Sequence, residues 1–235
     1  MIDKTVATCR EAVAQVFDGA SIMIGGFGDP GVPGQLIEAL RQQGASDLFV
    51  IHNGAGSGDF ALGGLMLDGR VRKLMASFPN YPGARAFRDR FLKGEVELEL
   101  VPQGTLVERI RAAGAGLGGF YTPTAAGTEL GASKEIRVID GQKYVFETPL
   151  HADFAFIKAY SGDRLGNLSY RMAMRNFNPI MATAAKVVIA EVEQLVPVGA
   201  LSHEEIHTPG IFVDRVVQVE RHPQLFDPPK KGGSQ

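Results

Sequence analysis

The residues best suited to chemistry lie in one glycine-dense run, residues 18–33. It reads Asp-Gly-Ala-Ser-Ile-Met-Ile-Gly-Gly-Phe-Gly-Asp-Pro-Gly-Val-Pro. Gly25, Gly26, Gly28 and Gly31 predict a loop whose path a residue with a Cβ would follow only with difficulty. Such a loop, placed just before a helix, leaves backbone N–H groups pointing outward, and these suit anionic or phosphorylated ligands. We therefore expect an anion site at this loop.

The residues of such a site would come from three points in the chain where a strand ends and a loop begins. Residues 21–24 are short and apolar like a buried strand, and Pro33 suits the first turn of the helix that follows. A second strand at 48–51 leads into a glycine-rich loop, and a period-two strand at 96–100 leads into Pro102-Gln103-Gly104. Ligands of parallel sheets bind beyond the carboxyl ends of the strands. We therefore predict that the loops at 25–33, 53–58 and 102–104 converge.

The remaining pattern indicates an α/β protein, with a mostly parallel open sheet, flanking helices and a small antiparallel insertion. Apolar spacing predicts helices over 3–16, 83–93, 106–113 and 175–184. Further strands are predicted at 73–78, 144–147, 154–160, 168–170, 186–192 and 211–219, and an irregular loop at 114–134. The edge position suits strand 96–100, whose glutamates alternate with apolar residues. We expect one domain over 1–222 and a disordered tail over 223–235.

Composition narrows the class of function. The chain has 235 residues, 45% hydrophobic and 21% charged, with a net charge of −2, which gives no electrostatic case for nucleic-acid or membrane binding. No stretch has the length of apolar sequence that a membrane span needs, and the N-terminus lacks a secretory signal. The single cysteine, Cys9, fits a reducing compartment. We therefore expect a cytoplasmic protein.

Two motifs are misleading. Residues 26–31 fit the dinucleotide pattern G-x-G-x-x-G, but Pro30 and Pro33 delay the helix, and His52-Asn53 stands where an acidic residue is needed. Residues 203–207, His-Glu-Glu-Ile-His, match a zinc-protease pattern. Prolines and glycines on both sides leave room for only about one helical turn there, so we favour a surface turn.

No catalyst is evident elsewhere in the chain. His151 and His222 have no metal-ligand spacing. His151 is either a satisfied histidine near a strand start, the interpretation we favour, or a residue that lines the site. Glu191 and Glu193 alternate on a strand, as residues at the edge of a core commonly do. We therefore expect no metal site, and a catalyst that lies on another chain.

At residues 18–33 the chain resembles family I coenzyme A transferases, with an Asp-Gly, an apolar triplet, Gly-Gly-Phe and then Gly-x-Pro. The resemblance continues through Val101–Thr105, Phe120–Thr124, His151–Ala155, Arg175–Phe177 and Pro209–Val213, and covers about residues 1–220. It is greatest to the α (A) subunit of the two-subunit 3-oxoacid enzymes. The fold it implies is the CoA-transferase, sugar-phosphate-isomerase-like fold.

The resemblance implies a mechanism with a covalent carrier. In this family a glutamate in a Ser-Glu-Asn-Gly segment of the β (B) subunit takes up CoA as a thioester, and this chain contains no such segment. Carried over by position, residues Gly25, Gly26, Phe27, Gly28, Asp29, Pro30 and Gly31 approach the thioester and CoA. Gln103 matches the glutamine that donates to the oxyanion, and Asn53 matches the first of two active-site asparagines, the second being Gly54 here.

Simpler interpretations remain open for single residues and for the whole chain. Gln103 would otherwise cap the helix after it, and Asn53 would otherwise be a turn residue. The chain would otherwise be a binding or regulatory module that senses CoA esters or phosphorylated metabolites, or a nicotinamide oxidoreductase. We expect the CoA-transferase α subunit, with the β subunit as partner in an αβ or (αβ)₂ assembly, CoA as a substrate and no cofactor. The sequence leaves open whether acetoacetate or 3-oxoadipate accepts CoA.

Overall fold

The computed structural model describes residues 2–220; the predicted tail at 223–235 and His222 lie outside these residues. Its main sheet has seven parallel strands, and a short strand β9 (Leu168–Ser169) pairs antiparallel with β8. In order across the sheet the parallel strands are β11 (Arg215–Gln218), β10 (Ala185–Val196), β8 (Ala152–Asp163), β1 (Ser21–Ile24), β2 (Leu48–Ile51), β3 (Val71–Ala76) and β4 (Glu97–Leu100). Strand β4 therefore lies at an edge, as predicted.

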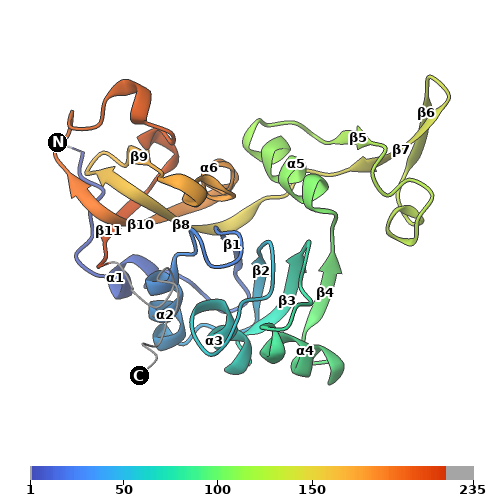
Figure 1. Ribbon diagram of the computed structural model, residues 1–235, viewed down its shortest axis with the longest axis horizontal. Helices are drawn as coiled ribbons and strands as arrows, with labels where there is room; N and C mark the ends of the chain where they lie inside the picture. Colours follow the sequence, from blue (N-terminus) through green and yellow to red (C-terminus); the bar gives the residue numbers. More distant parts are fainter. Residues whose placement is uncertain (1, 221–235) are drawn as a thin grey trace, which may run out of the picture.

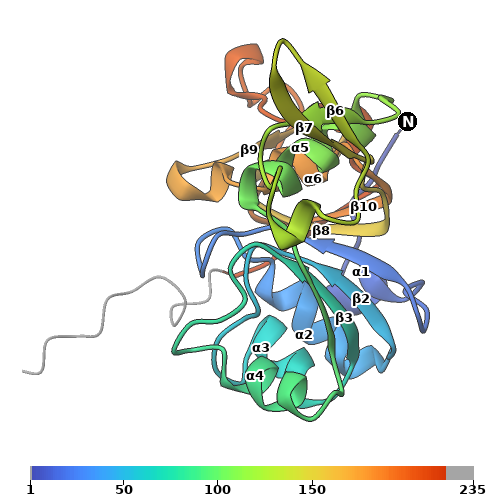
Figure 2. The ribbon, with the colours of Figure 1, turned by 90° about the vertical axis from the view of Figure 1, so that its right-hand side faces the viewer.

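Helices cover both faces of this sheet (Figures 1 and 2). They are α1 (Cys9–Val13), α2 (Gly34–Gln43), α3 (Ala61–Leu67), α4 (Arg85–Leu92), α5 (Gln103–Gly114) and α6 (Asn178–Met181). The pleat of β1 separates the two cores, because Ile22 and Ile24 pack with α1 to α4 whereas Met23 packs with α5 and α6. Both faces of the central strands are therefore buried, as a parallel sheet requires, whereas the edge strand β4 is partly exposed.

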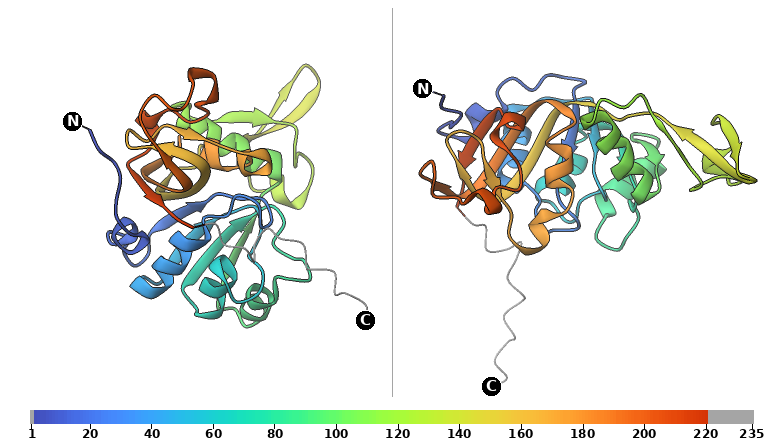
Figure 3. Two further views of the ribbon diagram at one scale, coloured as in Figure 1. Left: turned by 60° about the vertical axis from the view of Figure 1, so that its left-hand side comes forward. Right: turned by 90° about the horizontal axis from the view of Figure 1, so that it is seen from above.

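The antiparallel insertion is a separate three-stranded sheet. It contains β5 (Phe120–Thr122), β7 (Gln142–Glu147) and β6 (Ile136–Ile139), and it projects from the body of the molecule (Figures 1 and 3). The predicted irregular loop at 114–134 thus contains β5 and a 3₁₀ turn at Glu129–Gly131. The predicted strand at 154–160 is part of β8, which lies in the main sheet between β1 and β10.

The predicted helix over 3–16 is confirmed only over α1, Cys9–Val13. Helix α1 begins only at Cys9, because Thr8 caps it: the Thr8 hydroxyl accepts the Glu11 N–H at 3.1 Å. The residues before Thr8 are extended, and the Val6 N–H donates to the Val216 carbonyl at 2.9 Å. Pairing with β11 therefore takes precedence over the helical spacing of the apolar side chains.

Two further differences concern helices. The predicted helix at 175–184 is a 3₁₀ turn at Met172–Arg175 followed by the single turn of α6. Helix α3 was not predicted, because Gly63 and Gly64 weaken a helical pattern. Both glycines are required by packing against the backbone: a Cβ on Gly63 would lie 2.6 Å from the Ser57 carbonyl oxygen, and one on Gly64 would lie 2.7 Å from the Asp59 carbonyl oxygen. Within the described residues, no helix combines the length and hydropathy that a membrane crossing requires.

Candidate active site

The glycine loop after β1 is shaped by contacts within the protein. Gly26, Gly28 and Gly31 have φ angles of +119°, +60° and +76°, which side chains with a Cβ rarely allow. A Cβ on Gly25 would lie 1.8 Å from Asn178 Oδ1, and a Cβ on Gly26 would lie 2.5 Å from Val32 Cγ2. At these two glycines the backbone therefore packs closely against side chains of the same chain, not against a ligand.

Two asparagines hold this loop in place. Asn176 Oδ1 accepts the Gly26 N–H at 3.1 Å, and its Nδ2 donates to the Pro30 carbonyl at 2.9 Å. Asn178 Nδ2 donates to the Gly31 carbonyl at 3.0 Å, while its Oδ1 accepts the N–H of Lys158 on β8. These bonds explain why residues 175–184 do not form one regular helix, since the side chains turn toward the loop.

The start of α2 does not provide the open anion site that the sequence predicts. The N–H groups of Gln35 and Leu36 both donate to Glu191 Oε2 at 3.0 Å, and Lys158 Nζ lies 2.9 Å from Glu191 Oε1. Glu191 and Lys158 are 0% and 1% exposed. Burial raises the pKa of Glu191, whereas Lys158 and the two amides lower it. The chain thus supplies its own anion to this helix.

The N–H groups that remain available lie in the middle of the loop. Those of Gly25, Gly26, Phe27 and Val32 are bonded to acceptors within the protein. Within residues 2–220, no hydrogen bond uses the N–H groups of Gly28, Asp29 or Gly31. The anion site that the sequence predicts at this loop is therefore reduced to a few N–H donors around Gly28.

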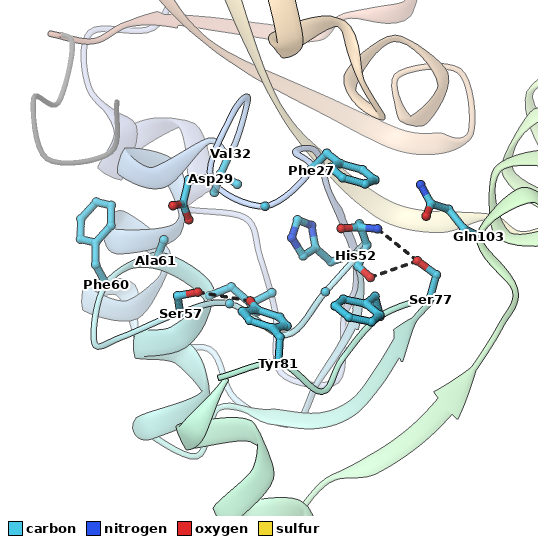
Figure 4. A pocket seen from close by; sticks show the side chains of 16 residues that line it. Phe27, Asp29, Val32, His52, Ser57, Phe60, Ala61, Ser77, Tyr81 and Gln103 are labelled. Carbon is cyan, nitrogen blue, oxygen red and sulfur yellow. Dashed lines mark hydrogen bonds between the residues drawn. The ribbon is translucent and has the colours of Figure 1, made fainter. Parts of the chain in front are cut away.

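The three predicted loops converge on one cavity of about 430 Å³ (Figure 4). This size is typical of a small-molecule site. Of the predicted site residues, Phe27, Gly28, Asp29, Asn53 and Gln103 line the cavity, whereas Gly25, Gly26, Pro30 and Gly31 do not. The other lining residues are Val32, His52, Gly54, Gly56, Ser57, Phe60, Ala61, Leu62, Ser77, Phe78 and Tyr81.

Gln103 is the first residue of α5 and does not cap it, since no side chain bonds to the start of that helix. Its side chain makes no hydrogen bond within residues 2–220 and lies at the cavity opposite Phe27 (Figure 4). Among the described residues, the Gln103 amide is thus available to a ligand. This position fits the predicted oxyanion donor, although its role stays a prediction.

Asn53 and His52 are fixed by the ends of neighbouring strands. The Asn53 carbonyl accepts the N–H groups of Ser77 and Phe78 at 3.2 and 2.9 Å, and Asn53 Nδ2 donates to Ser77 Oγ at 3.1 Å. His52 Nδ1 lies 2.8 Å from the Ile24 carbonyl, so Nδ1 carries the proton and Nε2 is the acceptor. Burial lowers the pKa of His52, and the bond to Ile24 opposes this. Burial therefore favours the neutral form of His52.

Several lining residues were not predicted as site residues. His52 and Ser57 lie in the second glycine loop, so the sequence could have predicted them as site residues. Tyr81 lies in the chain after β3, and only the fold shows that it reaches the cavity. His151 is exposed just before β8 and does not line the cavity. Residues 203–205 form a single 3₁₀ turn with a capping box from Ser202, which confirms the predicted surface turn.

Similarity to known proteins assigns the family. A model described as coenzyme A transferase matches residues 6–219, so the chain belongs to the coenzyme A transferase family. The chain is 54% identical over 219 residues to a Pseudomonas putida protein named as the A-subunit of 3-oxoadipate CoA-transferase, covering 93% of this chain and 95% of that protein. It is 46% identical to a Bacillus subtilis (strain 168) protein named as the probable A-subunit of succinyl-CoA:3-ketoacid coenzyme A transferase, over 91% and 89% of the two chains.

The fold agrees with this assignment. The crystal structure of glutaconate coenzyme A-transferase from Acidaminococcus fermentans superposes with a TM-score of 0.80, at 24% identity, over 94% of this chain and 77% of that chain. The predicted open α/β fold of this family is therefore confirmed, and a dinucleotide site at residues 26–31 is not needed to explain the motif. In addition, α2 begins at Gly34, after the motif, and its first amides are occupied by Glu191.

Proposed function

We infer that this chain is the α subunit of a 3-oxoacid CoA-transferase, which moves CoA from succinyl-CoA to a 3-oxo acid through a glutamyl-CoA thioester on the β subunit. One observation carries the inference: the cavity supplies hydrogen-bond donors to a carbonyl oxygen but only one acidic side chain among its described lining residues, Asp29. A CoA-transferase needs a carboxylate nucleophile. Its arrival from the β subunit fits the names of the relatives, which denote one subunit of a larger enzyme.

The proposed chemistry runs in two mirrored halves. The β-subunit glutamate attacks the acyl carbonyl of succinyl-CoA, and the CoA thiolate leaves to give a mixed anhydride. The thiolate then attacks the glutamyl carbonyl of that anhydride, which releases succinate and forms the glutamyl-CoA thioester. A 3-oxo acid takes up CoA by the same steps reversed. CoA is a substrate here, and no cofactor or metal is needed.

Residues of this chain stabilise the charge that develops in each step. Each tetrahedral intermediate carries an oxyanion, and a preorganised donor to it contributes about 3 kcal/mol. We assign this role to the Gln103 amide, which has no partner within residues 2–220, and to the available N–H of Gly28. Asn53, held by Ser77, orients the substrate acid.

The β subunit docks, in this proposal, beside the cavity. An apolar groove of about 520 Å³ runs between α4 and the edge strand β4, lined by Phe87, Phe91, Leu92, Leu98 and Leu100. Leu92 is 76% exposed. Ser77 and Phe78 line both the groove and the cavity. A partner seated on this groove therefore reaches the cavity, as the donor of the nucleophile must.

The test is co-expression with the adjacent gene, followed by assay of succinyl-CoA against a panel of acids. We expect formation of 3-oxoacyl-CoA by the complex and none by the chain alone. A complex that forms but turns over no acid would contradict the proposed function and favour the binding or regulatory module. The same assay in αβ and (αβ)₂ fractions would establish the stoichiometry.

A further inference from the structure

The cavity has two chemically different ends. Figure 4 shows Gln103 at the right and Ser57 at the left with His52 between them, and Tyr81 below His52, hydrogen-bonded to Ser57. Under the proposed function, on which the inference below rests, the reacting carboxyl group lies near Gln103. The opposite end is then the place for the tail of the acid, and its side chains decide which tail the cavity selects.

Gly54 makes room for Tyr81 at this far end. A Cβ on Gly54 would lie 3.3 Å from Tyr81 Cε1, slightly closer than ordinary van der Waals contact, and 3.4 Å from the Phe78 carbonyl oxygen, which is an ordinary contact. The Tyr81 ring stacks on Phe78 with ring centroids 6.2 Å apart and an interplanar angle of 5°. The Tyr81 ring thus packs closely beside Gly54, where a side chain at residue 54 would require the ring to shift by a few tenths of an ångström.

The hydroxyl group of Tyr81 is oriented to donate. Ser57 Oγ donates to the Tyr81 hydroxyl oxygen at 3.3 Å. A phenol that accepts from serine keeps its own proton for another acceptor. Within residues 2–220, no acceptor is assigned to that proton. The Ser57–Tyr81 pair therefore presents an O–H donor to whatever occupies this end of the cavity.

The surroundings of the pair define what it binds. No Lys or Arg is among the described residues that line the cavity, and Asp29 is the one acidic residue among them, so the pair recognises its ligand through hydrogen bonds rather than through opposite charge. Phe60 and Leu62 add apolar walls that suit methylene groups. A chain of methylenes that ends in an oxygen acceptor fits both features. Hydrogen bonds from neutral donors to a carboxylate are stronger than those to neutral acceptors.

We propose that the Ser57–Tyr81 pair, in the space left by Gly54, is the subsite that binds the tail of the acyl group and selects acids ending in a carboxylate. Succinate and 3-oxoadipate are acids of this class, whereas acetoacetate ends in a methyl group. The pair is a specificity determinant and takes no part in bond formation. The acceptor that the site prefers is accordingly a 3-oxo dicarboxylic acid.

The test uses the complex with the β subunit and measures kcat/KM for 3-oxoadipate and for acetoacetate. In Tyr81→Phe the ring stays and only the hydroxyl is lost. We expect its kcat/KM for 3-oxoadipate to fall about tenfold to hundredfold, the usual effect of one hydrogen bond to a charged group. The value for acetoacetate should stay unchanged. Ser57→Ala, at an exposed residue, should shift the same ratio less, because Ser57 only orients the phenol.

Tyr144→Phe is the matched control, since the Tyr144 hydroxyl lies on the projecting sheet, 3.4 Å from Gln142 Oε1. Equal losses for both acids in Tyr81→Phe would overturn the subsite and place the pantetheine arm of CoA at this end instead. No loss for either acid would overturn it as well. A wild-type complex that turns over neither acid would instead contradict the proposed function, which makes the two failures distinguishable.

Discussion

The buried ion pair beneath the glycine loop offers the sharpest stability prediction. Glu191 is buried on β10 and faces three donors: Lys158 Nζ on one carboxylate oxygen and the N–H groups of Gln35 and Leu36 on the other. In Glu191→Gln, either orientation of the new amide directs its NH₂ group at a donor. The variant also leaves the buried Lys158 ammonium without this carboxylate.

The magnitude follows from the burial. Removing one partner of a buried ion pair costs about 3–5 kcal/mol, whereas exposed pairs contribute about 0–1 kcal/mol. We therefore expect Glu191→Gln to lower the free energy of unfolding by about 3–5 kcal/mol. That loss is a large part of the total of about 5–15 kcal/mol for a typical domain.

Urea denaturation followed by far-UV circular dichroism is the assay, because the chain has no Trp. Lys186→Met is the matched control: Lys186 pairs with Asp153, but its side chain is 77% exposed, so we expect a loss below about 1 kcal/mol. The double variant with Lys158→Met should lose less than the sum of the two single variants. Equal small losses for Glu191→Gln and Lys186→Met would refute the reasoning.

Three further predictions address the site, the interface and pH. Gln103→Ala should lower kcat of the complex about 10²–10³-fold with little change in KM for succinyl-CoA, and an unchanged kcat in steady-state assays would exclude it as the oxyanion donor. Leu92→Asp should prevent co-elution with the β subunit in gel filtration while the melting temperature of the chain stays unchanged; persistent co-elution would place the interface elsewhere. Burial raises the pKa of Asp153, but Lys186 and Ser21 outweigh it and lower that pKa to about 2. The stability it adds is therefore complete above its unfolded pKa of about 3.9 and is lost as the pH falls through its folded pKa of about 2, so Asp153→Asn should cost about 1 kcal/mol at pH 6 and markedly less at pH 2.

The parts of the fold that depend on local pattern were predictable from sequence. Strand β1, the glycine loop and α2 follow from apolar spacing, four glycines and Pro33, and the convergence of three loops follows from the general rule for parallel sheets. Helix α3 was missed because two glycines interrupt its pattern, and only the packing of residues 57–59 against them explains why they are tolerated.

The parts that depend on distant contacts were not predictable. Alternation on β10 placed Glu191 at the edge of a core, yet its partner Lys158 lies 33 residues earlier and makes it a buried cap for α2. For the same reason the anion site predicted at the start of α2 is wrong: no local pattern indicates that Glu191 accepts the N–H groups of Gln35 and Leu36. Tyr81 likewise reaches the cavity only through the fold, which places it beside Gly54, 27 residues earlier in the chain.

The proposed mechanism depends most on the arrival of the reactive carboxylate from the β subunit. The most direct measurement incubates the complex with succinyl-CoA, traps the thioester with borohydride and locates the modified carboxyl group by mass spectrometry. We predict modification of a β-subunit glutamate, with this chain unmodified and Asp29→Asn still able to form the trapped species. Trapping on this chain, at Asp29 or at any other residue, would contradict the mechanism.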